Sequence, residues 1–345
     1  MPPEAFIGWD LGGAHLKAAR LDRSGRIEQV IQIPCALWRG LDQLHAALDA
    51  AVSRLGPAPV HAVTMTGEMV DLFPTREAGV QSLIAEMRGR FGAGVRVFGG
   101  AARLCSVDEA LHAPERLASA NWLATARVVA RLSPDALVAD VGSTTTDLTP
   151  VRAGEVRFHG RDDATRLASG ELVYRGVVRT PVMAMAERVP FGGEEVPLMA
   201  EWFAVAADVY RLTGQLPEGA DQHPTADGGD RSVAASARRL ARMIGRDAES
   251  AEPERWRELA RWLAAEQGRL LQLAAERVLA REPLPANAPI VAAGVGRFLL
   301  PALARSLGRE VVEFGALLPV APGQLGRVSD CAPAVAVGWL ATQEG

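Results

Sequence analysis

Three glycine-containing segments of this chain carry residue types that could bind an anion. The first segment, IGWDLGGAHLK, places Asp10 at the end of an apolar run and Lys17 after a glycine turn. Glycines at a turn let an anion approach backbone N–H groups, because no Cβ blocks the way. Asp10 could hold a hydrated Mg²⁺, and Lys17 could reach a phosphate as a point charge. We therefore predict an anion site here, formed by Gly12, Gly13, Ala14 and His15, with a plain hairpin turn as the alternative.

The second segment, VADVGSTTTDL, places small hydroxyl residues after Gly142. Their backbone and side-chain donors could bind phosphate oxygens, which makes Ser143, Thr144 and Thr145 candidate ligands. Asp140 and Asp147 would repel an anion unless a metal lies between them, and Mg²⁺ resolves that conflict. The alternative is a threonine-rich hairpin, since threonine favours strands.

The third segment, IVAAGVGR, runs from a strand into a helix through Gly294 and Gly296. Such a turn would let an adenine or a ribose lie against the backbone. A Gly-x-Gly turn after a strand is common, so the prediction of a nucleotide site depends on the order and spacing of all three segments.

The elements that position these segments follow from hydrophobic periodicity. Strands at 5–9, 16–21 and 27–33 predict a β-meander, because a strand rather than a helix follows the first glycines. Helical spacing at 41–55, 76–90 and 118–132 alternates with strands at 61–65, 95–98 and 136–141. The strand, glycine turn and strand pattern recurs near the middle of the chain. This recurrence predicts two similarly built halves.

The length of 345 residues allows two hydrophobic cores. We place the boundary near residue 118, which gives domains at 1–117 and 118–345. Helical periodicity at 201–212, 231–244 and 254–281 predicts a helical insertion at about 183–285 in the second domain. A strand at 289–293 follows, and we expect the final helix, 331–342, to pack back on the N-terminal domain.

Composition indicates an ordinary globular protein, with 48% hydrophobic and 23% charged residues. A formal net charge of −4 argues against a broad electrostatic contact with nucleic acid. The cysteines, Cys35, Cys105 and Cys331, form no CxxC pair and fit a reducing cytoplasm. Neither a signal peptide nor an apolar run of about 20 residues is evident. We expect a soluble cytoplasmic protein with no membrane partner, and the oligomeric state, including a homo-oligomer, is left open.

The segments DLGGAHLK and DVGSTTTDL resemble the two phosphate motifs of the sugar kinase, actin and heat-shock ATPase superfamily, and AAGVG resembles its adenosine motif. The resemblance implies an α/β fold of two ribonuclease H-like domains with a cleft between them. It also implies that Asp10 and Asp140 lie near a metal, and that ATP or a diphosphate group binds at the phosphate motifs. Arg297 replaces the small residue often found after the second glycine, so the nucleotide is left open.

A closer resemblance lies in the central segments RLASGELVYRGVVRTPV, VPFGGEEVPLMAEWFAVAADVYRLTG and TADGGDRSVAASARRLARMIGRD. They are similar to hydantoinase/oxoprolinase-related proteins linked to tetrahydromethanopterin C1 transfer. The resemblance implies a transferase of methanofuran or methylofuran biosynthesis. Its substrates would be a tyramine- or tyrosine-derived phenol and an aminomethylfuran-methyl diphosphate, joined through an ether with release of diphosphate.

On this hypothesis the phosphate turns bind the diphosphate leaving group. The phenol must lose its proton, and Glu68 and Asp147 are candidate bases that the sequence does not separate. For Glu68 the favoured interpretation is a carboxylate at the N-terminus of a helix. Arg175 and Arg179 could bind a substrate carboxylate, with an exposed hairpin as the alternative. The alternatives are an ATP-dependent small-molecule kinase or hydantoinase-like hydrolase, and a non-catalytic nucleotide-binding protein.

Two groups of side chains are interpreted as structural. Arg238, Arg239 and Arg242 fall on one predicted helix and are expected to form a solvated basic face. The tryptophans Trp9, Trp122 and Trp202 are expected in the core.

Overall fold

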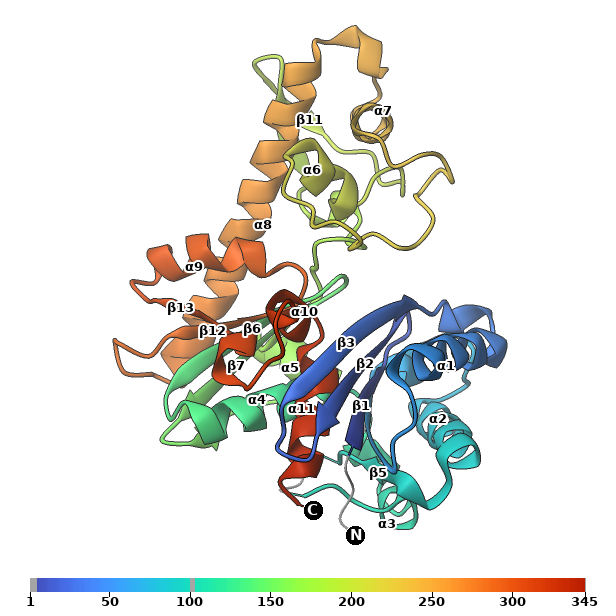
Figure 1. Cartoon of the computed structure of the whole chain (residues 1–345). Coiled ribbons are helices and arrows are strands. Elements are labelled where there is room, and N and C mark those ends of the chain that lie inside the picture. Colours follow the sequence, from blue (N-terminus) through green and yellow to red (C-terminus); the bar gives the residue numbers. More distant parts are fainter. Residues whose placement is uncertain (1–4, 100–102, 345) are drawn as a thin grey trace.

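A computed structural model describes residues 5–99 and 103–344 of the chain. Figure 1 shows two β-sheets in the lower part of the molecule and a helical arm above them. We use "the arm" for the helices α6 (Ala206–Leu212) and α7 (Val233–Arg242) together with the upper part of α8 (Pro253–Arg281).

The first sheet has the strand order β3-β2-β1-β4-β5. Its first three strands form the predicted antiparallel meander, and β4 and β5 are added in parallel to β1. The predicted strands and helices of this part are confirmed within a few residues, and one short helix, at 107–111, was not predicted. Their bounds are β1 (Ala5–Leu11), β2 (His15–Asp22), β3 (Ile27–Pro34), α1 (Leu41–Leu55), β4 (Val60–Met65), α2 (Arg76–Phe91), β5 (Val95–Val97), α3 (Val107–Leu111) and α4 (Asn121–Leu132).

The second sheet repeats this topology. Its order is β13-β12-β6-β7-β8, with β9 paired to β7. The strands β6, β7 and β8 form an antiparallel meander, and β12 and β13 are added in parallel to β6. The predicted recurrence is therefore confirmed at the level of strand order and direction. The strands are β6 (Ala136–Val141), β7 (Thr146–Arg152), β8 (Glu155–Val156), β9 (Leu172–Val173), β12 (Ile290–Ala293) and β13 (Val311–Glu313).

Helices α4 and α11 (Ala332–Thr342) lie between the two sheets (Figure 1). Successive side chains along a strand point to opposite faces of the sheet. Accordingly, Phe6 packs toward α4 and α11, whereas Ile7 packs toward α1 and α2. Helix α11 approaches β1 at Gly8, where an added Cβ would lie 2.0 Å from the Ala334 carbonyl oxygen. This contact joins the C-terminal helix to the strand that leads into the first phosphate turn.

The remaining elements lie beyond the second meander. The predicted helices at 201–212 and 231–244 are confirmed with shorter bounds as α6 and α7, and the one predicted at 254–281 is confirmed as α8, which begins one residue earlier. The hairpin of β10 (Arg188–Phe191) and β11 (Glu194–Pro197) was not predicted, nor were α5 (Asp163–Ser169) and α10 (Leu325–Asp330). Helix α9 (Leu300–Ser306) follows β12. Within the described ranges, the helices lack the combined length and apolar character that a bilayer crossing needs.

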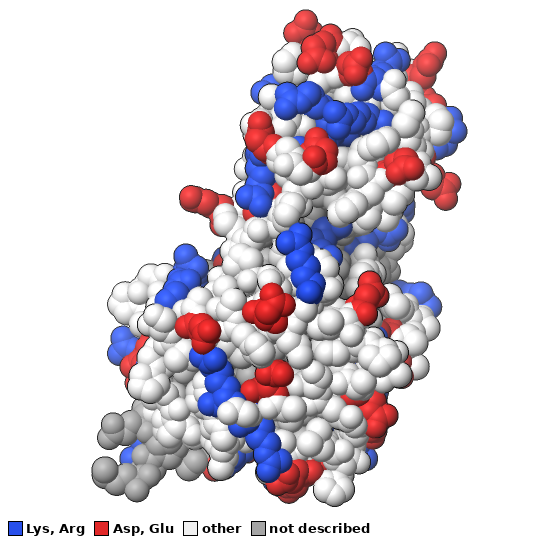
Figure 2. All heavy atoms as spheres, turned by 90° about the vertical axis from the view of Figure 1, so that its right-hand side faces the viewer, with Lys and Arg blue, Asp and Glu red and all other residues white. Residues whose placement is uncertain are grey.

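The interpretation of Arg239 as part of a solvated basic face is wrong. Its side chain is fully buried, with Nη2 lying 2.8 Å from Asp208 Oδ1 and Nη1 lying 3.0 Å from Asp227 Oδ1. Arg238 and Arg242, by contrast, are exposed. Figure 2 shows Lys and Arg side chains interspersed with Asp and Glu over one face of the molecule.

Candidate active site

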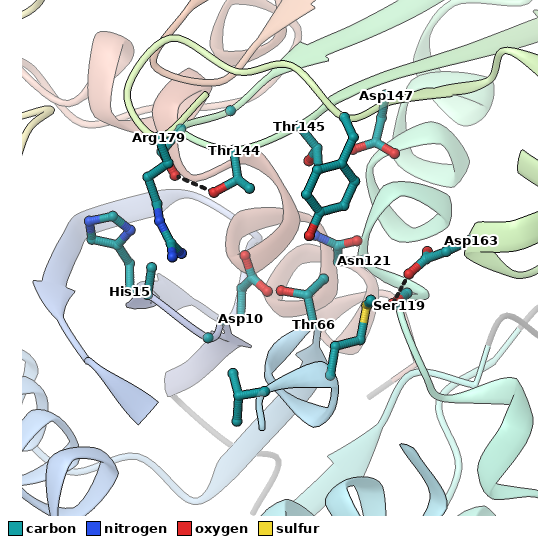
Figure 3. A pocket seen from close by; sticks show the side chains of 18 of the residues that line it. Asp10, His15, Thr66, Ser119, Asn121, Thr144, Thr145, Asp147, Asp163 and Arg179 are labelled. Atoms are coloured by element: carbon teal, nitrogen blue, oxygen red, sulfur yellow. Dashed lines mark hydrogen bonds between the residues drawn. The ribbon is translucent and has the colours of Figure 1, made fainter. Parts of the chain in front are cut away.

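Both predicted phosphate turns line one cavity of about 670 Å³ (Figure 3). The residues that they contribute are Asp10, Gly12, Gly13, Ala14, His15, Lys17, Gly142, Ser143, Thr144, Thr145 and Asp147. The first turn joins β1 to β2 and the second joins β6 to β7, so each sheet supplies the tip of its own first hairpin. The repeated topology therefore brings two segments that lie far apart in the sequence to the same cavity.

The two turns are closed in the same way. The Gly12 amide donates to the His15 carbonyl at 3.0 Å, and the Gly142 amide donates to the Thr145 carbonyl at 2.8 Å. A Cβ on Gly12 would lie 2.7 Å from the His15 carbonyl oxygen, so this close approach requires glycine.

The cation of the first turn faces its carboxylate. Asp10 is the cross-strand neighbour of Lys17, and Lys17 Nζ lies 3.7 Å from Asp10 Oδ2. Burial raises the pKa of Asp10 against the opposing attraction of Lys17. Burial alone would lower the pKa of Lys17, but Asp10 and Asp140 outweigh it, so that pKa is raised. Lys17 is therefore a permanent positive charge in the cavity.

Asp10 has the features of a Mg²⁺ ligand. Its Oδ1 is buried and has no hydrogen-bond partner in the described part of the chain. The described residues contain no group of three or more His, Cys, Asp or Glu side chains that could hold a metal by themselves. Mg²⁺ commonly binds through one or two carboxylates, water and substrate phosphates, which is compatible with this arrangement. Asp140 lies behind the second turn, where burial raises its pKa to about 7.

In the second turn, a buried arginine holds Asp147. Arg166 Nη1 donates to Asp147 Oδ1 at 2.6 Å, and the guanidinium lies 3.8 Å from the centroid of the Trp122 ring. Arg166 is only 1% exposed, so its position is fixed by these contacts. Burial raises the pKa of Asp147, although Arg166 opposes this effect.

The two arginines predicted to bind substrate lie in different surroundings. Arg179 lines the cavity, with its guanidinium 5.1 Å from the centroid of the Trp38 ring. Arg175 is turned toward the chain, where its Nε donates to the Ala184 carbonyl at 3.0 Å. The structure thus brings Arg179, but not Arg175, to the phosphate turns. Between them, Gly176 packs against the second turn.

Aromatic side chains form part of the cavity wall. Trp38, Tyr174 and Trp202 line it, and Tyr174 and Trp202 are 55% and 57% exposed. The expectation that Trp202 lies in the core is therefore wrong, whereas Trp9 and Trp122 are buried as predicted. Hydrophobic periodicity could not identify Trp202, because it lies outside a regular element.

The third glycine turn is packed against protein. A Cβ on Gly294 would lie 2.2 Å from the Val141 carbonyl oxygen, and one on Gly296 would lie 2.5 Å from Val141 Cγ1. Arg297 Nη1 donates to the Gly294 carbonyl at 3.2 Å and pairs with Asp330. Neither glycine lines the cavity described above. In this structure the glycines allow close contact with the end of β6.

A loop below the arm reaches the first phosphate turn. His223 Nε2 hydrogen-bonds to the Ala14 carbonyl at 2.7 Å, and its ring lies 4.8 Å from the His15 ring between centroids. Burial, with the nearby His223, lowers the pKa of His15 to about 3. His15 is therefore neutral at physiological pH. The sequence analysis missed His223, since no local pattern marks it.

Glu68, one of the two predicted bases, lies behind the cavity wall. It is 1% exposed, and burial raises its pKa. The Ser119 hydroxyl separates it from the cavity, lying 3.0 Å from Glu68 Oε1 and 3.3 Å from Asp163 Oδ2. Arg76 Nη2 binds the same Asp163 oxygen at 2.5 Å. Ser119 and Asp163 line the cavity, and the sequence analysis missed both.

Comparison with known proteins identifies related sequences and a related fold. A family model described as hydantoinase/oxoprolinase matches residues 60–323. The (4-{4-[2-(gamma-L-glutamylamino)ethyl]phenoxymethyl}furan-2-yl)methanamine synthase of Methanocaldococcus jannaschii is 30% identical over 274 residues, covering 79% of this chain and 80% of that protein. The enzyme of the same name from Methanococcus vannielii is 27% identical over 116 residues, covering 34% of this chain and 52% of that protein.

Among solved structures, nucleotide-free acetone carboxylase is similar, with a TM-score of 0.60 and 11% sequence identity. The similarity covers 98% of this chain and 70% of that chain. At this identity the likeness concerns the fold, and it agrees with the repeated sheet topology described above.

Proposed function

The chain belongs to the hydantoinase/oxoprolinase family and has the fold of the sugar kinase, actin and heat-shock ATPase superfamily, and on that basis we propose that it is a transferase of methanofuran-type cofactor biosynthesis. In this reaction a tyramine- or tyrosine-derived phenol attacks the methylene of an aminomethylfuran-methyl diphosphate. The phenol oxygen forms the ether bond, and diphosphate leaves. The synthase names of two relatives support this assignment.

One observation carries the proposal. The cavity combines two phosphate turns with exposed aromatic side chains, and neither glycine of the third turn lines it. A diphosphate on an aromatic substrate needs the phosphate turns and the aromatic side chains, but it does not need the third glycine turn. ATP, in contrast, would also need an adenosine site beside Gly294 and Gly296, which lie outside the lining of this cavity.

The chain's own residues can perform the two tasks of this reaction. The furan ring stabilises positive charge on its attached methylene, so departure of diphosphate is the step that needs most help. Lys17 and the donors of the two turns can hold the diphosphate as negative charge develops on it. A Mg²⁺ ion at Asp10, and at Asp140 behind the second turn, would neutralise part of that charge.

The aromatic wall can orient the acceptor. Trp38, Tyr174 and Trp202 offer faces against which a phenol and a furan can pack. Arg179 lies beside Trp38 and can pair with the carboxylate of a glutamyl or tyrosyl substrate. Holding both reactants in one cavity converts a bimolecular reaction into an effectively unimolecular one.

Calorimetry tests this assignment first. Metal-stripped protein is titrated with diphosphate, ADP and ATP, each with and without Mg²⁺. We expect Mg²⁺-dependent diphosphate binding at least tenfold tighter than ATP binding. The assay then follows diphosphate release and ether formation from tyramine and the furan diphosphate, without ATP. Tight ATP binding together with ADP formation would instead assign a kinase or hydrolase, and tight ATP binding without turnover a nucleotide-binding protein.

A further inference from the structure

We propose that Asp163 is the catalytic base that accepts the phenol proton, and that Ser119 and Glu68 position it. This inference rests on the proposed function and adds a residue to it. As the phenol oxygen bonds to the furan methylene, the C–O bond to diphosphate breaks and diphosphate takes the electron pair. The phenol proton moves to Asp163, so charge and atoms balance without a further reactant.

The first support is the arrangement of the cluster. Ser119 has one hydroxyl hydrogen but lies within hydrogen-bond distance of two carboxyl groups, 3.0 Å from Glu68 and 3.3 Å from Asp163. The Arg76 cation binds Asp163 at 2.5 Å, and the described ion pairs include none to Glu68. Both contacts to Asp163 use Oδ2, which leaves Oδ1 to accept a proton from a ligand.

The second support is the state of Glu68. It is 1% exposed, and its Oε2 has no hydrogen-bond partner among the described residues. A buried carboxylate without a cation in contact is costly, and burial raises the pKa of Glu68 accordingly. We infer that Glu68 carries a proton, so Ser119 joins one neutral acid to one carboxylate. The negative charge of the cluster then resides on Asp163, which lines the cavity.

The third support is the backbone of Ser119. Its φ of 50° places a residue other than glycine in the left-handed region. Such a conformation costs on the order of 1–3 kcal/mol and persists only where its surroundings impose it. Here it holds the hydroxyl of a buried serine between the two carboxyl groups, at the wall of the cavity.

Asp147 is less suited to this role. It belongs to the second phosphate turn, one of the two turns proposed to bind diphosphate. A nucleophile must reach the methylene from a side that the diphosphate does not occupy, so its base should lie away from the cations that bind diphosphate. Figure 3 shows Ser119 and Asp163 on the side of the cavity away from Arg179.

The test compares Asp163→Asn with Glu77→Gln, an exposed carboxyl on helix α2 outside the cavity lining. Removal of a general base typically costs 10²–10⁴-fold in rate, so we expect Asp163→Asn to lower kcat by about that factor. Glu77→Gln should stay within about twofold of the parent. Diphosphate affinity, measured by calorimetry, should be the same in all three proteins, because the phosphate turns are untouched.

A series of phenols separates a base from a merely structural residue. Ring-fluorinated tyramines lose their proton more readily, so the deficit of Asp163→Asn should shrink by at least tenfold from tyramine to the most acidic phenol. An equal deficit with every phenol, or a loss of less than threefold, would overturn the assignment. If the parent protein forms no ether at all, the proposed function itself fails. The two failures are thus distinguishable.

The positioning role has its own readout. The infrared difference spectrum of the parent against Glu68→Gln should contain the band of a protonated carboxyl group at neutral pH. Ser119→Ala should lower kcat by about tenfold while changing KM for the phenol by less than about twofold, because the hydroxyl is engaged by the two carboxyl groups. Absence of the protonated band, or an unchanged kcat in Ser119→Ala, would refute the proton sharing.

Discussion

Replacing Arg239 with methionine is expected to destabilise the arm. The guanidinium is fully buried, and it binds the carboxylate of Asp208, which is 1% exposed. Methionine is an adaptable apolar side chain that can occupy much of the same space, so the change mainly removes charge and hydrogen bonds. Asp208 then remains as a buried carboxylate with three other partners: Ser236 donates to its Oδ1 at 2.8 Å, Arg211 lies 3.3 Å from the same oxygen, and the Val205 amide donates to its Oδ2 at 3.1 Å.

The expected loss in the free energy of unfolding follows from these contacts. Removing one partner of a buried ion pair costs roughly 3–5 kcal/mol, because the other charge is left uncompensated. Since Arg211 still lies near the same oxygen, we expect the lower end, about 3 kcal/mol. Urea unfolding followed by circular dichroism measures the free energy of unfolding. Hydrogen exchange in α7 should show that the loss is local to the arm.

The adjacent Arg238 provides a matched control. It lies on the same helix but is exposed, so Arg238→Met should change the free energy of unfolding by less than about 0.5 kcal/mol. Adding Asp208→Asn to Arg239→Met should recover part of the loss, because it removes the uncompensated charge. The reasoning is refuted if Arg239→Met and Arg238→Met have the same stability, or if Asp208→Asn brings no recovery.

Three further predictions concern the sheets and the cavity. Trp9 Nε1 donates to His61 Nδ1 at 3.1 Å, and burial lowers the pKa of His61 to about 4. The folded pKa lies below the unfolded value of about 6.5, so His61 contributes stability that is lost as pH falls from 6.5 toward 4, about 3 kcal/mol in all. Urea titrations at pH 7 and pH 4 measure this loss of stability, which should be smaller in His61→Gln than in the parent protein. An equal loss in both proteins would contradict the role given to His61. His223→Ala removes a hydrogen bond to the first phosphate turn and should weaken diphosphate binding by about fivefold in calorimetry, while folding stability falls by no more than about 1 kcal/mol. Arg179→Met should raise KM for a phenol that carries a carboxylate by at least tenfold, but should not raise KM for tyramine. Arg175→Met should leave both KM values unchanged, because the Arg175 side chain is turned away from the cavity. Equal effects of the two substitutions would refute the assignment of Arg179.

Much of the fold could be predicted because its signals are local. The helix at 41–55 and the strand at 136–141 have the predicted bounds, since apolar periodicity and glycine or proline residues mark both. The recurrence of the meander was likewise visible, because each copy lies within one continuous segment. The hairpin of β10 and β11 was missed, since its short strands alternate poorly and are largely exposed.

In the candidate site, too, local contacts could be predicted and long-range contacts could not. Asp10 and Lys17 belong to one hairpin, so their contact follows from the register of that hairpin alone. Ser119 meets Glu68 and Asp163 across separations of 51 and 44 residues, and no local pattern marks such a contact. Residues so far apart in the sequence meet only because whole helices and strands pack together. A single sequence has no local pattern that predicts this packing.

Equivalent positions in the two phosphate turns carry opposite charges, and this gives the cavity a direction. Lys17 faces Asp10 across the first hairpin, and Asp147 occupies the same place opposite Asp140 in the second. A symmetric pair of lysines would bind an anion equally at both turns. With Asp147 held by Arg166 instead, the cation lies on the first turn, near the Asp10 carboxylate, whose Oδ1 has no hydrogen-bond partner among the described residues. In the proposed reaction, the negative charge that develops on diphosphate is therefore best stabilised at the first turn, while the second turn contributes neutral hydroxyl and backbone donors.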